Sequence, residues 1–273
     1  MSGTTSTERC DLALSTPAGR ITTSIEVPTG FVPVTAIVPL GRELAAQAQQ
    51  LEIDAATQEG RQVSCRQGCA ACCRMLVPLS APEAFHLSDA VTRLPEAARA
   101  RIHERLEHTR AALETAGLLP GLQALAETTH PVSDEELEPT NRAYYALRLP
   151  CPFLEADRCT VYDHRPSACR DLLVTSPAEW CNDLEHQPVN TLPVSVRVST
   201  ALGLLWASLR QEAPRLIPLP VALEWAHRHA PERATGSKGT DLLDTFLDKL
   251  WRLLSQEFAA RQVPPASAPP SQP

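Results

Sequence analysis

Eight of the nine cysteines lie in two groups whose spacing is typical of metal ligands. The first group reads C-x3-C-x2-C-C, and the second is spread over residues 151–181. Thiolates two or three residues apart can converge on one centre, and in a reducing compartment such clustering indicates metal binding rather than disulfides. The predicted metal ligands are therefore Cys65, Cys69, Cys72, Cys73, Cys151, Cys159, Cys169 and Cys181. The ninth, Cys10, stands alone near the N-terminus.

The donor set narrows the choice of metal but leaves two options. Sulfur is a soft ligand, so calcium and magnesium are excluded. Zinc takes four thiolates at ~2.3 Å, so eight cysteines could fill two zinc sites. A 4Fe-4S cluster also takes four cysteines and would leave spare thiols. We therefore expect either an iron–sulfur cluster or zinc.

The first group can bring its thiols together in a tight turn or on one helix face. In a helix, residues three and four apart are neighbours, which would join Cys65, Cys69 and either Cys72 or Cys73. Gly68 would relax the backbone so that the sulfurs can turn inward. Adjacent side chains point in different directions on a helix or strand. We therefore expect Cys72 and Cys73 to serve two metals, or one of them to be a reserve thiol.

Three other interpretations of the cysteines are weaker. Buried free cysteines can behave as small apolar residues, but four within nine positions is too dense for that. The C-x2-C spacing of a redox dithiol occurs at Cys69 and Cys72, yet no strand precedes it as in thioredoxin-like folds. The C-x3-C-x2-C spacing of radical SAM enzymes is also present. Those enzymes usually carry an aromatic residue where Ala71 stands here, and a long β/α barrel follows, whereas this sequence continues as helices.

At these residues the sequence resembles the YkgJ-type cysteine-cluster family of zinc- or iron-chelating domains. The matching motifs are C-x2-C-C at 69–73, C-P-F-L at 151–154, C-x-V-Y at 159–162, and R-P-x-x-C-R at 165–170. The resemblance covers about 60–185, and the first gap has three residues where the family pattern has two. It implies metal chelation by the cysteines.

The same family includes flagellin lysine N-methylases. The resemblance therefore suggests an alternative function, an S-adenosylmethionine-dependent protein-lysine methyltransferase. Against this alternative, the sequence has no glycine-rich strand-turn-helix fingerprint for that cofactor. A third alternative is a structural zinc module that organises a surface for a protein partner. Family membership alone does not decide between these activities.

Composition limits the partners and the location. The 273 residues are 43% hydrophobic, enough for a core, and the net charge of −7 argues against binding to nucleic acid. No apolar run approaches the ~18 residues of a membrane span. The polar N-terminus has no apolar signal-peptide region, so we expect a cytoplasmic protein without membrane contact.

The remaining patterns predict a mainly α fold. We expect an unstructured leader over 1–20, one domain over 21–262 with its motif core at 60–185, and an unstructured proline-rich tail over 263–273. Residues 21–39 favour a short two-stranded β ribbon. Residues 151–181 are predicted to form a cysteine-lined loop region. Within it, Ser176 is expected to cap a short helix that carries Cys181. Apolar periodicity and capping signals predict helices over 42–58, 80–91, 95–116, 119–128, 134–147, 195–210 and 241–260.

Overall fold

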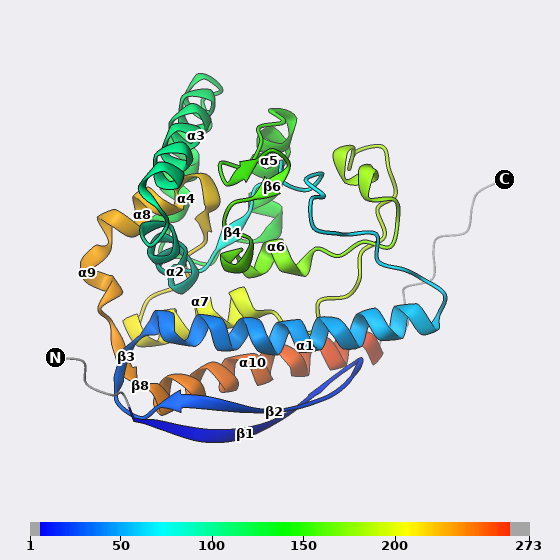
Figure 1. Ribbon diagram of the computed structural model, residues 1–273, viewed down its shortest axis with the longest axis vertical. Helices are drawn as coiled ribbons and strands as arrows, with labels where there is room; N and C mark the ends of the chain where they lie inside the picture. Colours follow the sequence, from blue (N-terminus) through cyan, green and yellow to red (C-terminus); the bar gives the residue numbers. More distant parts are fainter. Residues whose placement is uncertain (1–5, 263–273) are drawn as a thin grey trace.

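A β ribbon and two long helices form the base of the molecule in the computed structural model, which describes residues 6–262 (Figure 1). The ribbon pairs β1 (Thr7–Thr16) with β2 (Gly19–Pro28) in antiparallel register. Its β2 strand contacts both α1 (Ile37–Gln58) and α10 (Gly239–Gln262). The predicted mainly α fold with a short N-terminal ribbon is confirmed.

The ribbon lies earlier in the chain than predicted. The prediction of an unstructured leader over 1–20 is wrong for residues 7–16, which form β1, while residues 1–5 lie outside the described part. The predicted pairing within 21–39 is also wrong, because β2 pairs with β1, and β3 (Phe31–Pro33) pairs with β8 (Gly236–Lys238). Leu12, partly buried, and Leu14, buried, lie on one face of β1, so the strand is held by apolar contact with the core.

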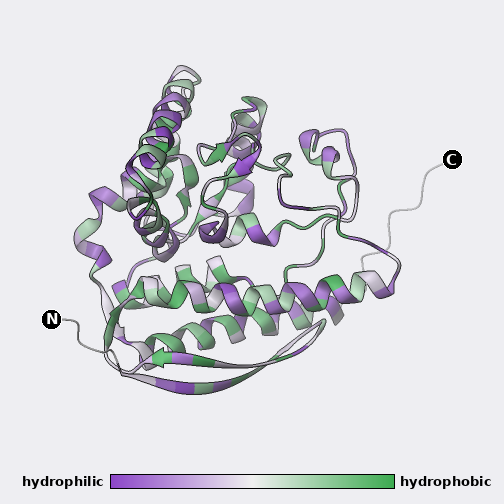
Figure 2. Cartoon of the chain, in the orientation of Figure 1, coloured by the Kyte–Doolittle hydropathy of each residue, from purple (hydrophilic) through white to green (hydrophobic). Residues whose placement is uncertain are grey.

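Helix α1 packs against α7 (Val198–Arg210) and α10 at close range. Gly41 permits this approach, because a Cβ there would lie 2.9 Å from Val198 and 3.0 Å from Phe246. The apolar stripes predicted on these helices face one another, as the green inner surfaces in Figure 2 show. These three helices therefore form a packed layer on which the rest of the chain is built.

The other elements stand on this layer in the upper half of Figure 1. The longer helices there are α2 (Ala81–Thr92), α3 (Glu96–Thr115), α4 (Leu119–Ala126), α5 (Asp134–Ala146) and α8 (Ala222–Arg228). The short helices are α6 (Ser167–Asp171) and α9 (Ala230–Arg233). The short strand pairs are β4 (Pro78–Leu79) with β7 (Ile217–Pro218), and β5 (Leu154–Glu155) with β6 (Arg158–Cys159).

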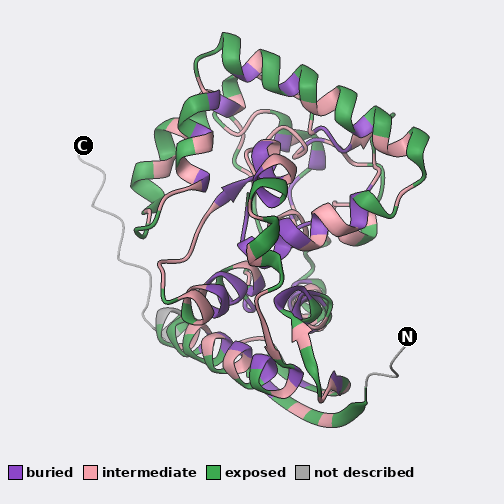
Figure 3. Cartoon of the chain, turned by 90° about the vertical axis from the view of Figure 1, so that its left-hand side faces the viewer, coloured by how far each residue is buried: buried purple, intermediate pink, exposed green. Residues whose placement is uncertain are grey.

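An aromatic cluster joins α7 of the helix layer to α2 and α8, which stand on that layer. Phe85 of α2 lies 5.7 Å from Trp206 of α7 and 5.1 Å from Trp225 of α8, measured between ring centroids. All three side chains are fully buried. For the described residues, Figure 3 shows buried positions gathered towards the middle and exposed positions on the outward helix faces.

The predicted helices occur within a few residues of their expected bounds, except that α1 begins earlier, at Ile37. Both predicted capping boxes are present, at Ser80 with Glu83 and at Ser133 with Glu136. Helix α8 lacked a sequence signal because it is too short to show periodicity. None of the helices in the described residues is long and apolar enough to cross a bilayer. The predicted tail over 263–273 lies outside those residues.

Candidate metal centre

The first cysteine segment folds as tight turns, which decides between the two arrangements left open by the sequence. The backbone N–H of Cys69 donates to the carbonyl of Arg66 at 3.0 Å, and that of Cys73 donates to Ala70 at 3.0 Å. Gly68 has a φ of +86°, a left-handed conformation that glycine adopts at little cost, as predicted. These turns leave the thiols of the segment half-buried rather than hidden in a helix face.

The adjacent pair does not diverge as expected. Residues 71–74 form a turn, not a helix or a strand, so the side chains of neighbouring residues can meet. The two thiols interact strongly enough to shift each other's pKa in opposite directions. Their interaction lowers the pKa of Cys72 and raises that of Cys73. Cys72 is therefore the member of the pair that gives up its proton more readily.

The second segment presents Cys151 and Cys159 from a small hairpin, β5–β6. Phe153 and Val161 are buried in the core and fix the two ends of the hairpin. The N–H and the hydroxyl of Thr160 both donate to the carbonyl of Phe153, at 2.8 and 2.9 Å. The apolar positions of the C-P-F-L and C-x-V-Y motifs thus serve as anchors that hold the two cysteines in place.

The arginines of the R-P-x-x-C-R motif hold the loop before α6 in place by stacking and hydrogen bonds. The guanidinium of Arg165 stacks over the ring of Tyr162, 3.7 Å from its centroid. Arg170 donates to the carbonyls of Asp163 at 2.7 Å and Arg165 at 3.2 Å. Because both ends of this loop are tied, Cys169 on the intervening helix has a defined position.

Cys181 joins the first segment in space although it belongs to the second in sequence. It packs with Cys65 and Cys69 in a small apolar cluster around Val174, separate from the main core. The short helix predicted to carry Cys181 is present as a 3-10 helix, Ala178–Asn182. The prediction that Ser176 caps this helix is wrong, because its hydroxyl instead accepts a hydrogen bond from the N–H of Asn190.

Backbone hydrogen bonds bring the two segments together. The N–H of Cys151 donates to the carbonyl of Cys73 at 2.7 Å, and the N–H of Ser64 donates to Val174 at 2.9 Å. The N–H of Val174 also points at the Cys65 sulfur, 3.3 Å away. In Figure 1 the cyan loop of the first segment accordingly runs between the green β5–α6 region and the yellow-green loop that follows it.

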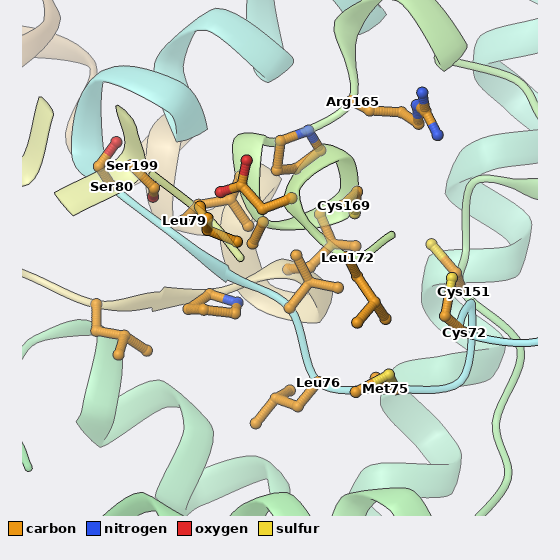
Figure 4. A pocket seen from close by; sticks show the side chains of 18 of the residues that line it. Cys72, Met75, Leu76, Leu79, Ser80, Cys151, Arg165, Cys169, Leu172 and Ser199 are labelled. Carbon is orange, nitrogen blue, oxygen red and sulfur yellow. The ribbon is translucent and has the colours of Figure 1, made fainter. Parts of the chain in front are cut away.

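A cavity of about 1080 Å³ opens beside this meeting point. Figure 4 shows Cys72 and Cys151 at one end of it and Ser80 with Ser199 at the other, with leucines between them. The cysteines in its wall are Cys69, Cys72, Cys73, Cys151, Cys159 and Cys169. Cys65 and Cys181 lie outside this wall, and Cys10 lies on the ribbon, where it packs against the core. The cavity leaves most of the clustered thiols reachable from outside.

Burial favours the protonated form of four of the clustered thiols. It raises the pKa of Cys65, Cys151, Cys169 and Cys181, and the charge on Cys72 adds to the rise at all four. The thiolate of Cys72 is therefore within electrostatic reach of both segments. Arg165 opposes the rise at Cys169, since a cation favours a nearby thiolate. A metal that binds here must displace protons from most of its ligands.

Three charged residues carried no sequence signal for this site: Asp171 lines the cavity, and Arg42 and Glu83 are buried outside its wall. Arg42 is buried on α1, and its Nε and Nη2 have no hydrogen-bond partner among the described residues. Burial lowers its pKa to about 10, and the charges of Glu83 and Cys169 oppose that decrease. Asp171 accepts from the Gln49 side chain at 3.1 Å. Glu83 was recognised only as a helix cap, because contacts between distant elements leave no mark in local spacing.

The donor set fits a thiolate-bound metal. A buried guanidinium beside the cysteines is compensated when those thiols become thiolates, as they do on metal binding. Within residues 6–262, no three histidine, cysteine or acidic side chains are gathered closely enough to hold one ion in the recorded arrangement. The nine cysteines are all free of disulfides, so every thiol is available for metal binding.

The comparisons with known proteins agree with this donor set. Residues 64–183 match a family model described as "CxxCxxCC: putative zinc- or iron-chelating domain". The match confirms the resemblance seen in the motifs and spans the segment from Ser64 to Asp183, which includes all eight clustered cysteines. No curated protein and no solved structure matches the chain.

Proposed function

We propose that this protein binds zinc or an iron–sulfur cluster through cysteines of both segments, since residues 64–183 match the family model of zinc- or iron-chelating domains. One observation carries the proposal. Six thiols from segments separated by four helices share the wall of a single cavity. Soft sulfur donors from distant parts of a chain meet in this way where a metal joins them.

The packing favours two sets of thiols that cross the sequence groups. Cys65 and Cys69 gather with Cys181 around Val174. Cys151 and Cys159 instead pack against the main core, and Cys169 lines the cavity beside them. Each of the two sets therefore contains three thiols.

The adjacent pair Cys72 and Cys73, which lines the same cavity, can complete both sets. The charge of Cys72 affects thiols on both sides, and the carbonyl of Cys73 accepts from the N–H of Cys151 at 2.7 Å. One member of the pair for each set gives two groups of four. Four thiolates are what a structural zinc site requires and what a 4Fe-4S cluster requires.

The two metals would supply different chemistry. Zinc bound by four thiolates has no open position and stabilises the fold, whereas an iron–sulfur cluster transfers electrons. In either case the residues of this chain act in the same way. The turns at 65–74 and the β5–β6 hairpin present the thiols, and the cavity admits the metal.

The test is metal analysis of the full-length chain purified without oxygen. We expect zinc or iron bound to the wild-type chain. A brown sample with visible absorbance identifies an iron–sulfur cluster, and a colourless sample containing zinc identifies zinc. A chain that contains neither metal, and that takes up neither when reconstituted under reducing conditions, contradicts the proposal.

Cys10 provides a matched control within the same chain. Cys72→Ser removes the thiol that lies within electrostatic reach of both sets, so metal content per chain should fall. Cys10→Ser changes a partly buried cysteine on the ribbon, away from the cavity, and should leave metal content at the wild-type level. Equal losses in both variants would mean that the site is wrongly assigned.

A further inference from the structure

Glu83 holds three separate elements through one buried carboxylate. Its side chain has no exposure to solvent. Oε2 accepts hydrogen bonds from the N–H of Ser80 at 3.2 Å, from the Ser80 hydroxyl at 2.9 Å and from the Ser199 hydroxyl at 2.5 Å. Oε1 accepts from the backbone N–H of Ser167 at 2.8 Å. The carboxylate therefore joins α2 to α7 and to the first turn of α6.

Only part of this arrangement is helix capping. The contacts with Ser80 belong to the capping box at the start of α2. The contacts with Ser167 and Ser199 reach other elements and contribute nothing to that cap. A buried carboxylate is costly unless it is hydrogen-bonded and compensated by a positive charge. The buried guanidinium of Arg42 lies near enough for the Glu83 charge to oppose the decrease in the Arg42 pKa. The cap alone does not account for a carboxyl group that also accepts from Ser167 and Ser199.

The contact with Ser167 bears directly on the cysteines. Helix α6 spans Ser167–Asp171, too short to hold its place by an apolar stripe. Ser167 is its first residue, and Cys169 follows in the same turn, so a displacement at Ser167 is passed on to Cys169 within ~3 Å of helix rise. The Ser167 hydroxyl has no hydrogen-bond partner among the described residues, which leaves its backbone N–H as the polar link to Glu83.

We propose that Glu83 is a positioning residue of the metal centre: by fixing the first turn of α6 it sets the place from which Cys169 reaches the cavity. This inference rests on the proposed function and deepens it. Glu83 does not touch the metal. Residues that orient metal ligands in this way typically contribute ~10–100-fold to metal affinity.

The test measures Co²⁺ binding to the full-length reduced chain by its thiolate-to-metal absorption. Glu83→Gln keeps the size of the side chain but removes its charge. We expect Co²⁺ affinity to fall ~10–100-fold and the absorption bands to shift. The matched control is Glu52→Gln, because Glu52 is also a buried glutamate, and it accepts from Ser195 and from Arg261 at 2.7 Å, away from the cavity. This control should bind Co²⁺ like the wild type.

A second pair of variants serves if Glu83→Gln does not fold by circular dichroism. Ser167→Pro removes the N–H that donates to Glu83, and proline is well tolerated at the first position of a helix. Ser167→Ala keeps that N–H and removes only the unpartnered hydroxyl. We expect Ser167→Pro to weaken Co²⁺ binding and Ser167→Ala to leave it unchanged.

The outcomes separate the two proposals. If the wild type binds Co²⁺ and the folded Glu83→Gln and Ser167→Pro variants bind it equally well, the positioning role is wrong. Equal weakening in Glu83→Gln and Glu52→Gln also overturns it, since the effect would then follow from any lost buried carboxylate. If the wild type binds neither Co²⁺ nor the metals named above, the proposed function itself fails.

Discussion

The backbone N–H of Cys151 donates to the carbonyl oxygen of Cys73 at 2.7 Å. This hydrogen bond joins the two cysteine segments directly, although α2, α3, α4 and α5 lie between them in the chain. It aligns the two backbones so that both residues contribute to one cavity wall. We expect bound metal to hold the region 151–181 in place.

Metal removal should loosen this region without unfolding the helices. Between its core anchors it has short 3-10 turns and a five-residue helix, so its own packing is weak. Metal–thiolate bonds between distant residues convert binding energy into folding energy. After chelation under reducing conditions, trypsin should cut faster near Arg158, Arg165 or Arg170. The helical circular dichroism signal should stay nearly constant, because α1, α7 and α10 are held by apolar packing.

Cleavage on α3 is the internal control for this experiment. Arg110 is exposed on that helix, so its cutting rate should not depend on metal. Equal cutting of 151–181 with and without metal would show that something other than metal holds the loop.

Single cysteine substitutions should remove metal from one thiol set at a time. Cys181→Ser should abolish the binding step that depends on Cys65 and Cys69, and Cys159→Ser should abolish the other. Titration with Co²⁺ should then give half the wild-type stoichiometry in each variant. Loss of all metal in either single variant would indicate one shared centre instead of two.

The sequence was sufficient to predict the elements whose packing is local. The stripes of α1, α7 and α10 follow the helical period, and the capping boxes at Ser80 and Ser133 marked the starts of two helices. The ribbon strand β1 was missed, even though Cys10, Leu12 and Leu14 alternate along it. Its serines and threonines resemble a disordered leader until the core against which its apolar residues pack is known.

The ligand residues were predictable, but their grouping was not. Spacing and soft-donor chemistry identify the eight thiols, because both follow directly from the amino-acid sequence. The packing of Cys181 with Cys65, and the three-helix contact of Glu83, depend on elements far apart in sequence. No local pattern encodes such contacts, which is why Arg42 and Asp171 were also missed.

Acid should destabilise the fold through His86. Burial, followed by the charge of Arg42, lowers the pKa of His86 to about 4 from an ordinary value of 6.5. His164 and Arg93 act in the same direction, and Glu83 opposes them. Between about pH 6.5 and pH 4, His86 binds a proton in the unfolded chain but not in the folded chain. The free energy of unfolding should therefore fall as pH drops from about 6.5 towards 4.

Denaturant unfolding of the metal-free reduced chain across this pH range tests the prediction. His86→Gln should flatten the dependence, because glutamine does not titrate. His103→Gln, at an exposed histidine on α3, is the control for removing an imidazole in general. A slope that is the same in His86→Gln and in the wild type would assign the acid sensitivity to other groups.

A substitution in the aromatic cluster should lower the stability of the fold without weakening metal binding. Phe85 is fully buried between Trp206 and Trp225, and Phe85→Ala should cost about 3–5 kcal/mol of unfolding free energy through the cavity that it leaves. Trp251 is 55% exposed on α10, and Trp251→Ala should change stability by less than about 0.5 kcal/mol. Unfolding in urea at a fixed metal load compares the two.

Phe85 lies two residues after Glu83 on the same helix, yet its ring joins the core rather than the cavity wall. Where Phe85→Ala remains folded, α2 still carries the Glu83 carboxylate that fixes α6. Co²⁺ affinity measured on the folded fraction should therefore stay close to wild type, in contrast to Glu83→Gln. If Phe85→Ala weakens Co²⁺ binding as strongly as Glu83→Gln does, the affinity depends on the general rigidity of α2 and not on the contact between Glu83 and Ser167.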